Sequence, residues 1–398
     1  MDERGDDVPA YRTIRMTTPE SPVAALADIE AWKARKTYPS TLFAGGPVFG
    51  VAVERDEGGW ELHPYFSGLA PQDARDSLGS HFRRLSQQAA KAGDTDAEAE
   101  YLAAGDRLDW ERLDEMTVRG CRYRVVRAER FIRMGPDGPE PPRDTDPDPG
   151  ATGRAGEALD PAAGLVIDPV HATGVSEGVL RVELLAALRK GGTVPADVHQ
   201  DARTAADTHP GGVLLPATFM TAEREGGRWR PDSSGTATTP QSARDGLAMQ
   251  LRVMVPWQKD LGPSEREIYA RAADRLDAER LDELDVAGRH FRIVRVERLV
   301  RIGPDGPEGP RPSDADPTPP VMVQDQQLRE RGVFTGDDGP DVQGAEGLGD
   351  DATADDGGEP DEHTQRFIRL FEEERRRRDA VRDRAADGTD GSDGPGSV

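Results

Sequence analysis

Residues 106–140 read DRLDWERLDEMTVRGCRYRVVRAERFIRMGPDGPE, and residues 274–308 read DRLDAERLDELDVAGRHFRIVRVERLVRIGPDGPE. The two stretches lie 168 residues apart without a gap, and about two-thirds of their positions are identical. Similarity at one fixed offset is typical of an internal repeat, and here it decides how the rest of the chain is interpreted. Weaker matches upstream extend the repeated unit to roughly 47–148 and 216–317.

Hydrophobic periodicity predicts the same order of elements in each unit. The first unit is expected to contain two strands, two helices and a β-rich run, at 48–54, 60–66, 71–92, 94–113 and 118–134. Helical lead-ins are expected before each unit, at 23–36 and 179–189. Strands followed by helices and again by strands indicate an α+β fold. We therefore predict a tandem duplication of a strand–helix–helix–strand unit in a pseudo-twofold arrangement.

The C-terminal part of the chain has a different composition. Between Gly332 and Gln365 there is no Lys or Arg, but there are eleven Asp and Glu residues. Such a segment cannot bury enough apolar surface to fold, so we expect a disordered tether followed by an amphipathic helix. The predicted organisation is an N-terminal arm, a first unit, a linker, a second unit, the tether, the helix and a disordered tail, at 1–10, 11–150, 151–178, 179–320, 321–361, 362–386 and 387–398.

Composition and charge exclude several classes of protein. The 398 residues include 51 Lys or Arg and 75 Asp or Glu, a formal net charge of −24 at pH 7, which opposes sequence-independent binding to DNA or anionic membranes. A single cysteine, Cys121, excludes an intramolecular disulfide and cysteine-built zinc sites. No apolar run approaches the ~20 residues of a membrane span, and residues 1–7 lack the apolar core of a signal peptide. We expect a cytoplasmic protein with no membrane contact.

The run Tyr123-Arg124-Val125-Val126-Arg127, together with the GPDGPEPPR at 135–143, carries a family resemblance. It is similar to an actinobacterial (streptomycete-type) family known only as a domain of unknown function, as are the segments 47–50 and 370–374. The resemblance covers most of the chain outside the acidic tether and the last residues. It implies an actinobacterial cytoplasmic protein, and it implies no activity, cofactor or catalytic residue.

Motifs for nucleotide, metal and nucleophile chemistry are missing or broken. The prolines of GPDGP remove the N–H groups that would hold a phosphate, so we interpret this motif as a turn. The acidic stretch 144–148 lacks the glycine and the closing Glu of a calcium loop, and we expect a solvated linker there. Cys121 lies beside Arg119 and Arg122, which favour a lowered pKa, but a passive exposed thiol is the preferred interpretation. No metal-binding spacing is found among the histidines, which are His63, His81, His171, His199, His209, His290 and His363.

Acidic residues alternate with arginines at the start of both quoted stretches. The retained carboxylates of the first are Asp106, Asp109, Glu111, Asp114 and Glu115. A hydrolase with paired carboxylates would need one of them in a cleft with a raised pKa. Because arginines are interleaved with them, we expect ion pairs at i, i+3 and i, i+4 on a solvent-facing helix.

Arginines recur at every third residue in both β-rich runs, at positions 124, 127, 130 and 133 and at 292, 295, 298 and 301. Strand residues alternate between two faces, so Tyr123, Arg127 and Phe131 share one face. Such a face resembles the platforms that stack nucleobases, but Glu129 and Glu297 can neutralise the adjacent arginines. We therefore favour structural ion pairs of Arg127 and Arg295 over contact with an anion, a nucleic acid or a protein.

The leading hypothesis is a non-enzymatic binding or scaffold protein without a cofactor. One alternative is a small-molecule-binding protein or enzyme with its site between the two units. A second is binding of nucleic acid or an anionic ligand by the Arg-rich strands, which the net charge disfavours. The C-terminal helix is expected to dock on the chain's own body or on a protein partner. The candidate ligand or partner surface comprises Tyr123, Arg127, Phe131, Arg133, Phe291, Arg295, Arg301, Phe367, Leu370 and Phe371.

Overall fold

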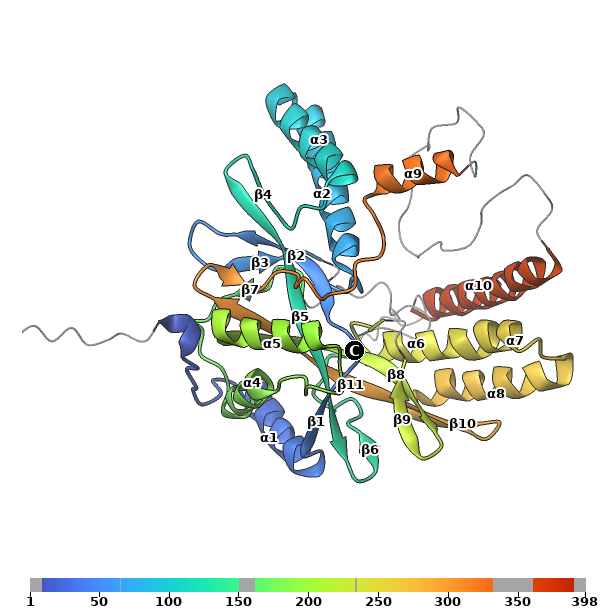
Figure 1. Cartoon of the computed structure of the whole chain (residues 1–398). Helices are drawn as coiled ribbons and strands as arrows, with labels where there is room; N and C mark the ends of the chain where they lie inside the picture. Colours follow the sequence, from blue (N-terminus) through green and yellow to red (C-terminus); the bar gives the residue numbers. More distant parts are fainter. Residues whose placement is uncertain (1–8, 65, 150–161, 233–234, 332–360, 390–398) are drawn as a thin grey trace, which may run out of the picture.

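The computed structural model describes residues 9–64, 66–149, 162–232, 235–331 and 361–389 (Figure 1). Its helices are η1 (Ala10–Arg12), α1 (Pro22–Thr37), α2 (Pro71–Ala92), α3 (Thr95–Trp110), α4 (Val175–Ala186), α5 (Ala196–Thr208), α6 (Pro240–Met249), the π-helical η3 (Gln250–Met254), α7 (Val255–Gln258), α8 (Pro263–Glu279), α9 (Val321–Glu330) and α10 (Glu362–Thr389). Its strands are β1 (Ser40–Phe43), β2 (Val48–Glu54), β3 (Trp60–Leu62), β4 (Glu115–Val118), β5 (Cys121–Gly135), β6 (Gly138–Pro139), β7 (Val166–Ile167), β8 (Gly211–Glu225), β9 (Arg228–Pro231), β10 (Glu283–Val286), β11 (Arg289–Gly303) and β12 (Gly306–Pro307). The mixed α and β architecture agrees with the predicted class.

The described strands form one curled antiparallel sheet in the order β7-β3-β2-β5-β11-β8-β9. Strands β1, β4 and β6 also pair with β5, and β10 and β12 pair with β11. The quoted stretches supply β5 and β11, which cross at the centre of the molecule (Figure 1). In their register Arg130 lies opposite Arg298, and Ile132 lies opposite Val296. Arg130 and Arg298 are thus equivalent positions that face each other. The pairs on either side of them, Ile132–Val296 and Ala128–Val300, are related by the 168-residue offset.

Helices α2 and α3 cover the first half of the sheet, close to where the periodicity predicts them. Helix α2 begins at Pro71. Proline is favourable there because an N–H in the first turn of a helix has no acceptor within the helix. Asp73 accepts hydrogen bonds from two backbone N–H groups ahead of the helix. The helix ends at Gly93, which adopts the left-handed conformation with φ 76°. Leu78 and Phe82 are fully buried in the core beneath it.

In the second half of the sheet, α6, η3 and α7 take the place of the single helix α2. The π-helical turn η3 lies directly before Pro256. Proline has no N–H to donate to the carbonyl of Arg252 four residues earlier, which is a common cause of irregular helical turns. Leu247 and Leu251 still reach the core, where they pack with Leu276 of α8. The second core is thus built like the first, except that the helix that covers it is locally distorted.

The second helical lead-in differs from the prediction. A helix does form near 179–189, as α4, but α5 lies between it and β8 and was not predicted. Helix α5 precedes β8 as α1 precedes β1. The only residues of α5 that are buried are Ala202 and Ala205, so no large apolar residues mark its inner face. Hydrophobic periodicity could not detect a helix that packs through alanine.

The C-terminal region is also corrected in part. Helix α9 forms at 321–330, where the tether was expected to start. Helix α10 is present as predicted and continues to Thr389, three residues beyond its expected end. The predicted disordered segment 337–361 lies outside the described residues except at Asp361, as do most of the N-terminal arm and of the tail.

Candidate functional site

The strand residues that were predicted to form a binding surface are buried. Six of the seven are at most 6% exposed, and the side chain of the seventh, Arg295, is 12% exposed. Tyr123 packs beneath α2 and α3, Phe291 beneath α6 and α8, and Phe131 against α4. The six are Tyr123, Arg127, Phe131, Arg133, Phe291 and Arg301. This face of the strands is covered by helices and loops, so nucleobases could not stack on it. These residues therefore give no support to the nucleic-acid hypothesis.

Arg127 lies at the centre of a buried ion cluster, which we name the first arginine cluster. Its guanidinium contacts Glu129 and Asp314, each at 2.8 Å. Glu129 also pairs with Arg311 at 3.0 Å and with Arg189 at 3.3 Å. Burial alone would raise the pKa of Glu129, but the adjacent arginines lower it to about 2. The predicted Arg127–Glu129 ion pair is present, and the carboxylate is held in its charged form.

A second arginine cluster surrounds Arg295 in the same way. Arg295 pairs with Asp146 at 3.0 Å and with Glu297, as predicted for the latter. Arg143 pairs with Glu140 at 2.6 Å and reaches Glu297 at 3.5 Å. Burial alone would lower the pKa of Arg295, but the surrounding carboxylates raise it above its usual value. In both clusters a strand and the Pro- and Asp-rich segment that follows a quoted stretch each supply an arginine and at least one carboxylate.

The Pro- and Asp-rich segments after each quoted stretch cross to the opposite half of the molecule. Asp316 from the second half binds Arg75 of α2 at 2.6 Å, and Asp148 from the first half binds Arg244 of α6 at 2.8 Å. The prediction that 144–148 is a solvated linker is therefore wrong for Asp146 and Asp148, whereas Asp144 is exposed. The arginines that hold them lie far away in the sequence, where local composition gives no sign of them. We name 140–148 and 308–316 the crossing segments.

The GPDGP turns reach across the molecule together with the crossing segments. Gly306 packs on the ring of Trp60, and Gly138 packs on the ring of Trp229. Arg124 and Arg292 lie over the same two rings, each 4.8 Å from the ring centroid. Each tryptophan thus contacts an arginine of its own half and a glycine turn of the opposite half, and the arginine also donates a hydrogen bond to that turn. The interpretation of GPDGP as a turn is confirmed.

The remaining titratable groups form no metal or catalytic cluster. His63 and His81 are in contact, with ring centroids 4.3 Å apart, and Tyr123 lies beside both rings. Burial lowers the pKa of His81 to about 4, with smaller contributions from His63 and Arg84, so its ring is neutral at pH 7. Cys121 is exposed. In the part of the chain that the structure describes, no group of three or more His, Cys, Asp or Glu could hold a metal ion.

The acidic helix faces form the predicted solvent-side ion pairs. Arg107 pairs with Glu111 at 3.2 Å, and Arg275 pairs with Glu279 at 3.4 Å, both at i, i+4. Isolated exposed pairs of this kind contribute about 0.3–0.5 kcal/mol each. These carboxylates are not gathered in a cleft, so they support no hydrolase.

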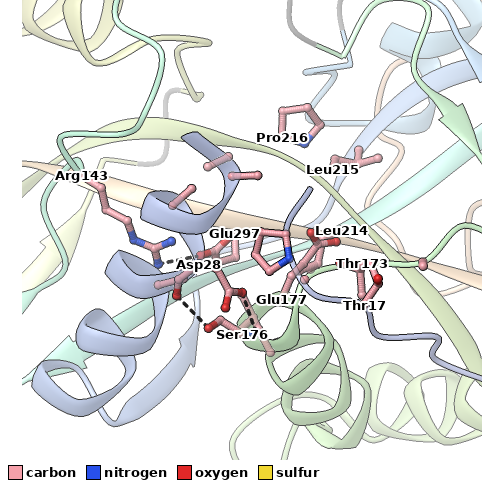
Figure 2. Close-up of a pocket in the computed structure, with 18 of the residues that line it drawn as sticks. Thr17, Asp28, Arg143, Thr173, Ser176, Glu177, Leu214, Leu215, Pro216 and Glu297 are labelled. Atoms are coloured by element: carbon pink, nitrogen blue, oxygen red, sulfur yellow. Dashed lines mark hydrogen bonds and ion pairs between the residues drawn. The ribbon is translucent and has the colours of Figure 1, made fainter. Parts of the chain in front are cut away.

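A cavity of ≈ 550 Å³ lies between α1, α4 and the sheet (Figure 2). Alanines of α1 and leucines of α4 and β8 make up much of its wall. Asp28 joins α1 to α4, because its carboxylate accepts a hydrogen bond from the N–H of Ser176 and its carbonyl accepts one from the Ser176 hydroxyl, both at 2.8 Å. Arg143, Arg295 and Glu297 of the second arginine cluster also line it. The cavity therefore joins elements of both halves.

Two buried polar atoms on the wall of this cavity have no hydrogen-bond partner among the described residues. They are Nε of Arg133, whose residue is 2% exposed, and Oγ1 of Thr173, whose residue is 7% exposed. The other end of the Arg133 guanidinium lies 3.4 Å from Glu183. A buried donor without an acceptor costs about 1–3 kcal/mol. Both residues therefore combine a place on the cavity wall with a buried polar atom that lacks a partner among the described residues.

The equivalent arginine of the other half is fully engaged. Arg301 donates hydrogen bonds to the carbonyls of Leu185 at 2.7 Å and His209 at 3.4 Å. The space beside it is ≈ 10 Å³, because α4 and α5 fill it. Of these two equivalent positions, the one at Arg133 has both an open cavity and a guanidinium nitrogen without a partner among the described residues.

The three C-terminal residues of the predicted surface lie on the side of α10 that packs on the body of the chain. Leu370 is buried, Phe367 lies 5.1 Å from Trp257 between ring centroids, and Phe371 lies beside Phe367. Glu374 is 3% exposed and is surrounded by three arginines, Arg252, Arg377 and Arg378. Of the two docking modes that the sequence left open, the structure shows the one on the chain's own body.

Replacing Glu374 by alanine is expected to release α10 without unfolding the body. The substitution leaves Arg378 without its buried carboxylate, while Arg377 keeps Asp277 and Arg252 keeps Asp274 and Asp277. Hydrogen exchange should show amides of residues 366–378 exchanging about ten- to a hundredfold faster, since docking stabilises them by a few kcal/mol. The matched control is Glu372→Ala, whose carboxylate is half-exposed and bonds only Arg376 among the described residues. Equal exchange in both variants would contradict the prediction.

The chain matches the family of unknown function DUF5954 over residues 21–317 and belongs to that family. The match includes α1, both halves of the sheet and both crossing segments. No curated protein and no solved structure matches the chain. None of the helices in the described ranges has the length and apolarity that a membrane span requires.

Several cavity residues were not found from the sequence. Arg143 and Arg311 follow the two GPDGPE motifs at the same distance, so the repeat itself could have indicated them as a pair. Asp28, Ser176 and Thr173 stand outside the repeated stretches and have no pattern of their own. Their meeting depends on how α1 packs on α4, which the sequence does not specify locally.

Proposed function

We propose that this protein is a binding protein that holds a small anionic molecule in the cavity between α1, α4 and the sheet. The observation that carries this proposal is Arg133, a residue of the cavity wall whose buried Nε has no acceptor among the described residues. A carboxylate or phosphate oxygen would complete the guanidinium and accept from the Thr173 hydroxyl. Arginine is well suited to such planar, charge-assisted recognition.

The surroundings of the cavity support a single anionic group at Arg133. The other cationic residues on its wall, Arg143 and Arg295, already pair with Glu297 and with the crossing segment. The N-terminus of α4 is already capped by Asp28. Arg133 is therefore the lining cation with capacity left for a ligand among the residues described.

The lining residues favour binding over catalysis. They include no His, Cys, Lys or Tyr in the described part of the chain. Ser176 donates its hydroxyl proton to the backbone carbonyl of Asp28, while the Asp28 carboxylate accepts from the Ser176 N–H. Nucleophilic catalysis needs a nucleophile whose proton is held by a base, and in this arrangement the Ser176 hydroxyl is not bonded to a carboxylate.

We also infer that the chain is a tandem duplication with a pseudo-twofold axis near the Arg130–Arg298 pair. The symmetric register of β5 and β11, the paired arginine clusters and the paired tryptophan sites support it. In this arrangement each half is completed by the crossing segment of the other. The cytoplasmic location and the actinobacterial origin stay predictions.

The proposed function predicts saturable binding of small anions that depends on Arg133. Calorimetric titration of the full chain with phosphate, acetate and a four-carbon dicarboxylate should give binding to at least one of them. Arg133→Gln should weaken that binding about tenfold or more, because a hydrogen bond to a charged group contributes about 1.5–3 kcal/mol.

Arg301→Gln is the matched control, since it removes the equivalent arginine where the space is filled. That variant should lose stability but keep the dissociation constant of the wild type. Equal binding by the wild type and Arg133→Gln would contradict the proposal, as would equal weakening by both variants. Absence of binding for all three anions would contradict it too.

A further inference from the structure

The outer face of α1 exposes a row of large apolar side chains. Val23, Leu26, Ile29 and Trp32 follow one another at intervals of three, and they are 74%, 51%, 52% and 40% exposed. At about 100° per residue, Leu26 and Ile29 point about 60° apart, and Val23 and Trp32 flank them on opposite sides of the helix. The helix itself is well defined, because the Ser21 side chain accepts a hydrogen bond from the N–H of Ala24 and Pro22 occupies the first turn. We name these four residues the α1 ridge.

Helix α5 provides an internal comparison for this ridge. It ends at Thr208-His209-Pro210 before β8, as α1 ends at Thr37-Tyr38-Pro39 before β1, an offset of 171 residues. Glu30 of α1 and Asp201 of α5 both accept a backbone N–H from a crossing segment.

The same offset places Asp197, Gln200 and Arg203 of α5 where α1 has Leu26, Ile29 and Trp32. The outer face of α5 is thus polar where the outer face of α1 is apolar, although the two helices occupy matching places in the fold. The fold itself therefore does not require the apolar residues of α1.

We propose that the α1 ridge is the contact surface between two copies of this chain, with the two α1 helices antiparallel. The ridge is self-complementary about the point midway between Leu26 and Ile29. An antiparallel pair centred there places Leu26 against the partner's Ile29, with Val23 and Trp32 at opposite borders of the contact. A twofold contact of this type buries the same patch on both subunits.

The charges around α1 favour the antiparallel orientation. Glu20 is exposed just before the helix, and Lys33 and Lys36 are exposed in its second half. Antiparallel packing brings Glu20 beside the partner's Lys36, whereas parallel packing would bring like charges together. One helix ridge makes a small interface, so the dimer is expected to be of the weak, micromolar kind.

The test measures the mass of the full chain by sedimentation between about 1 and 100 µM, where a micromolar dimer must dissociate and form. The wild type should shift from monomer to dimer over this range. Ile29→Glu should stay monomeric, and Gln200→Glu, the matching change on α5, should leave the shift unchanged. Circular dichroism and the melting temperature confirm that each variant is folded. A wild type that stays monomeric throughout, or an Ile29→Glu variant that still dimerises, would overturn the proposal.

Cross-linking then tests the orientation in a Cys121→Ser background. A mixture of Leu26→Cys and Ile29→Cys chains should form a disulfide-linked heterodimer on mild oxidation. Each chain alone should cross-link much less. Efficient cross-linking of Leu26→Cys with itself would indicate a parallel pair and overturn the antiparallel arrangement. Binding of the monomer to neutral lipid vesicles, lost in Ile29→Glu, would assign the ridge to a membrane surface instead.

Discussion

Replacing Glu129 by alanine is expected to lower the free energy of unfolding by about 3–5 kcal/mol. Glu129 is 5% exposed and pairs with Arg127, Arg311 and Arg189. Its removal leaves several guanidinium groups buried with too few carboxylates, and a buried unpaired charge costs much more than an exposed one. Urea denaturation of the wild type and the variant measures the difference directly.

The matched control is Glu115→Ala, which removes a carboxylate that is 42% exposed and also bound by two arginines, Arg122 and Arg124. Exposed pairs contribute about 0–1 kcal/mol, so this variant should stay close to the wild type. A loss for Glu129→Ala no larger than that for Glu115→Ala would show that the first arginine cluster is not a stabilising centre. Glu297→Ala should reproduce the large loss through the second arginine cluster.

Replacing Gly306 by alanine is expected to destabilise the protein by about 2–4 kcal/mol. The residue has φ 105°, a conformation that side chains rarely adopt, and an added Cβ would meet Nε1 of Trp60 far inside van der Waals distance. The turn would have to move away from the ring, which would also disturb Arg124, because its guanidinium donates hydrogen bonds to the carbonyls of Asp305 and Pro307. Thermal unfolding of Gly306→Ala measures the loss, and Gly138→Ala should show a similar one at Trp229.

Gly288→Ala separates the two causes of that loss. Gly288 also has a positive φ, 74°, but an added Cβ there meets nothing within 4 Å. Its alanine variant therefore reports backbone strain alone, about 1 kcal/mol. If Gly306→Ala were no more destabilising than Gly288→Ala, the packing of the turn on Trp60 would be unimportant for stability.

Elements with strong periodicity could be predicted from the sequence, and those held by distant polar contacts could not. Helix α2 and strand β2 have the predicted bounds because their apolar residues recur at the helical and strand periods. The shared face of Tyr123, Arg127 and Phe131 was also predicted, but its burial was not. Charged residues on a strand indicate an exposed face unless carboxylates from segments far away in the sequence pair with them.

The same limit applies to the candidate site. The crossing segments look like linkers because proline and aspartate are typical of linkers, yet Asp146 and Asp314 are nearly fully buried. Arg133 was among the predicted residues, but its repeat position made it look equivalent to Arg301. The difference arises from α1, α4 and α5, of which α5 has no apolar pattern. A site that exists in only one half cannot be found by comparing the halves.

The crossing segments have a consequence for how the chain can be divided. Residues 1–150 alone would contain Arg75 and Arg127 without Asp316 and Asp314, which belong to the other half. Neither half is therefore an autonomous domain, and the described body should unfold in a single cooperative step. Under the proposed duplication, the ancestral single unit could have neutralised these arginines only by exchanging segments with another chain. In that history the present protein is an obligate, strand-exchanged dimer that has become covalently continuous.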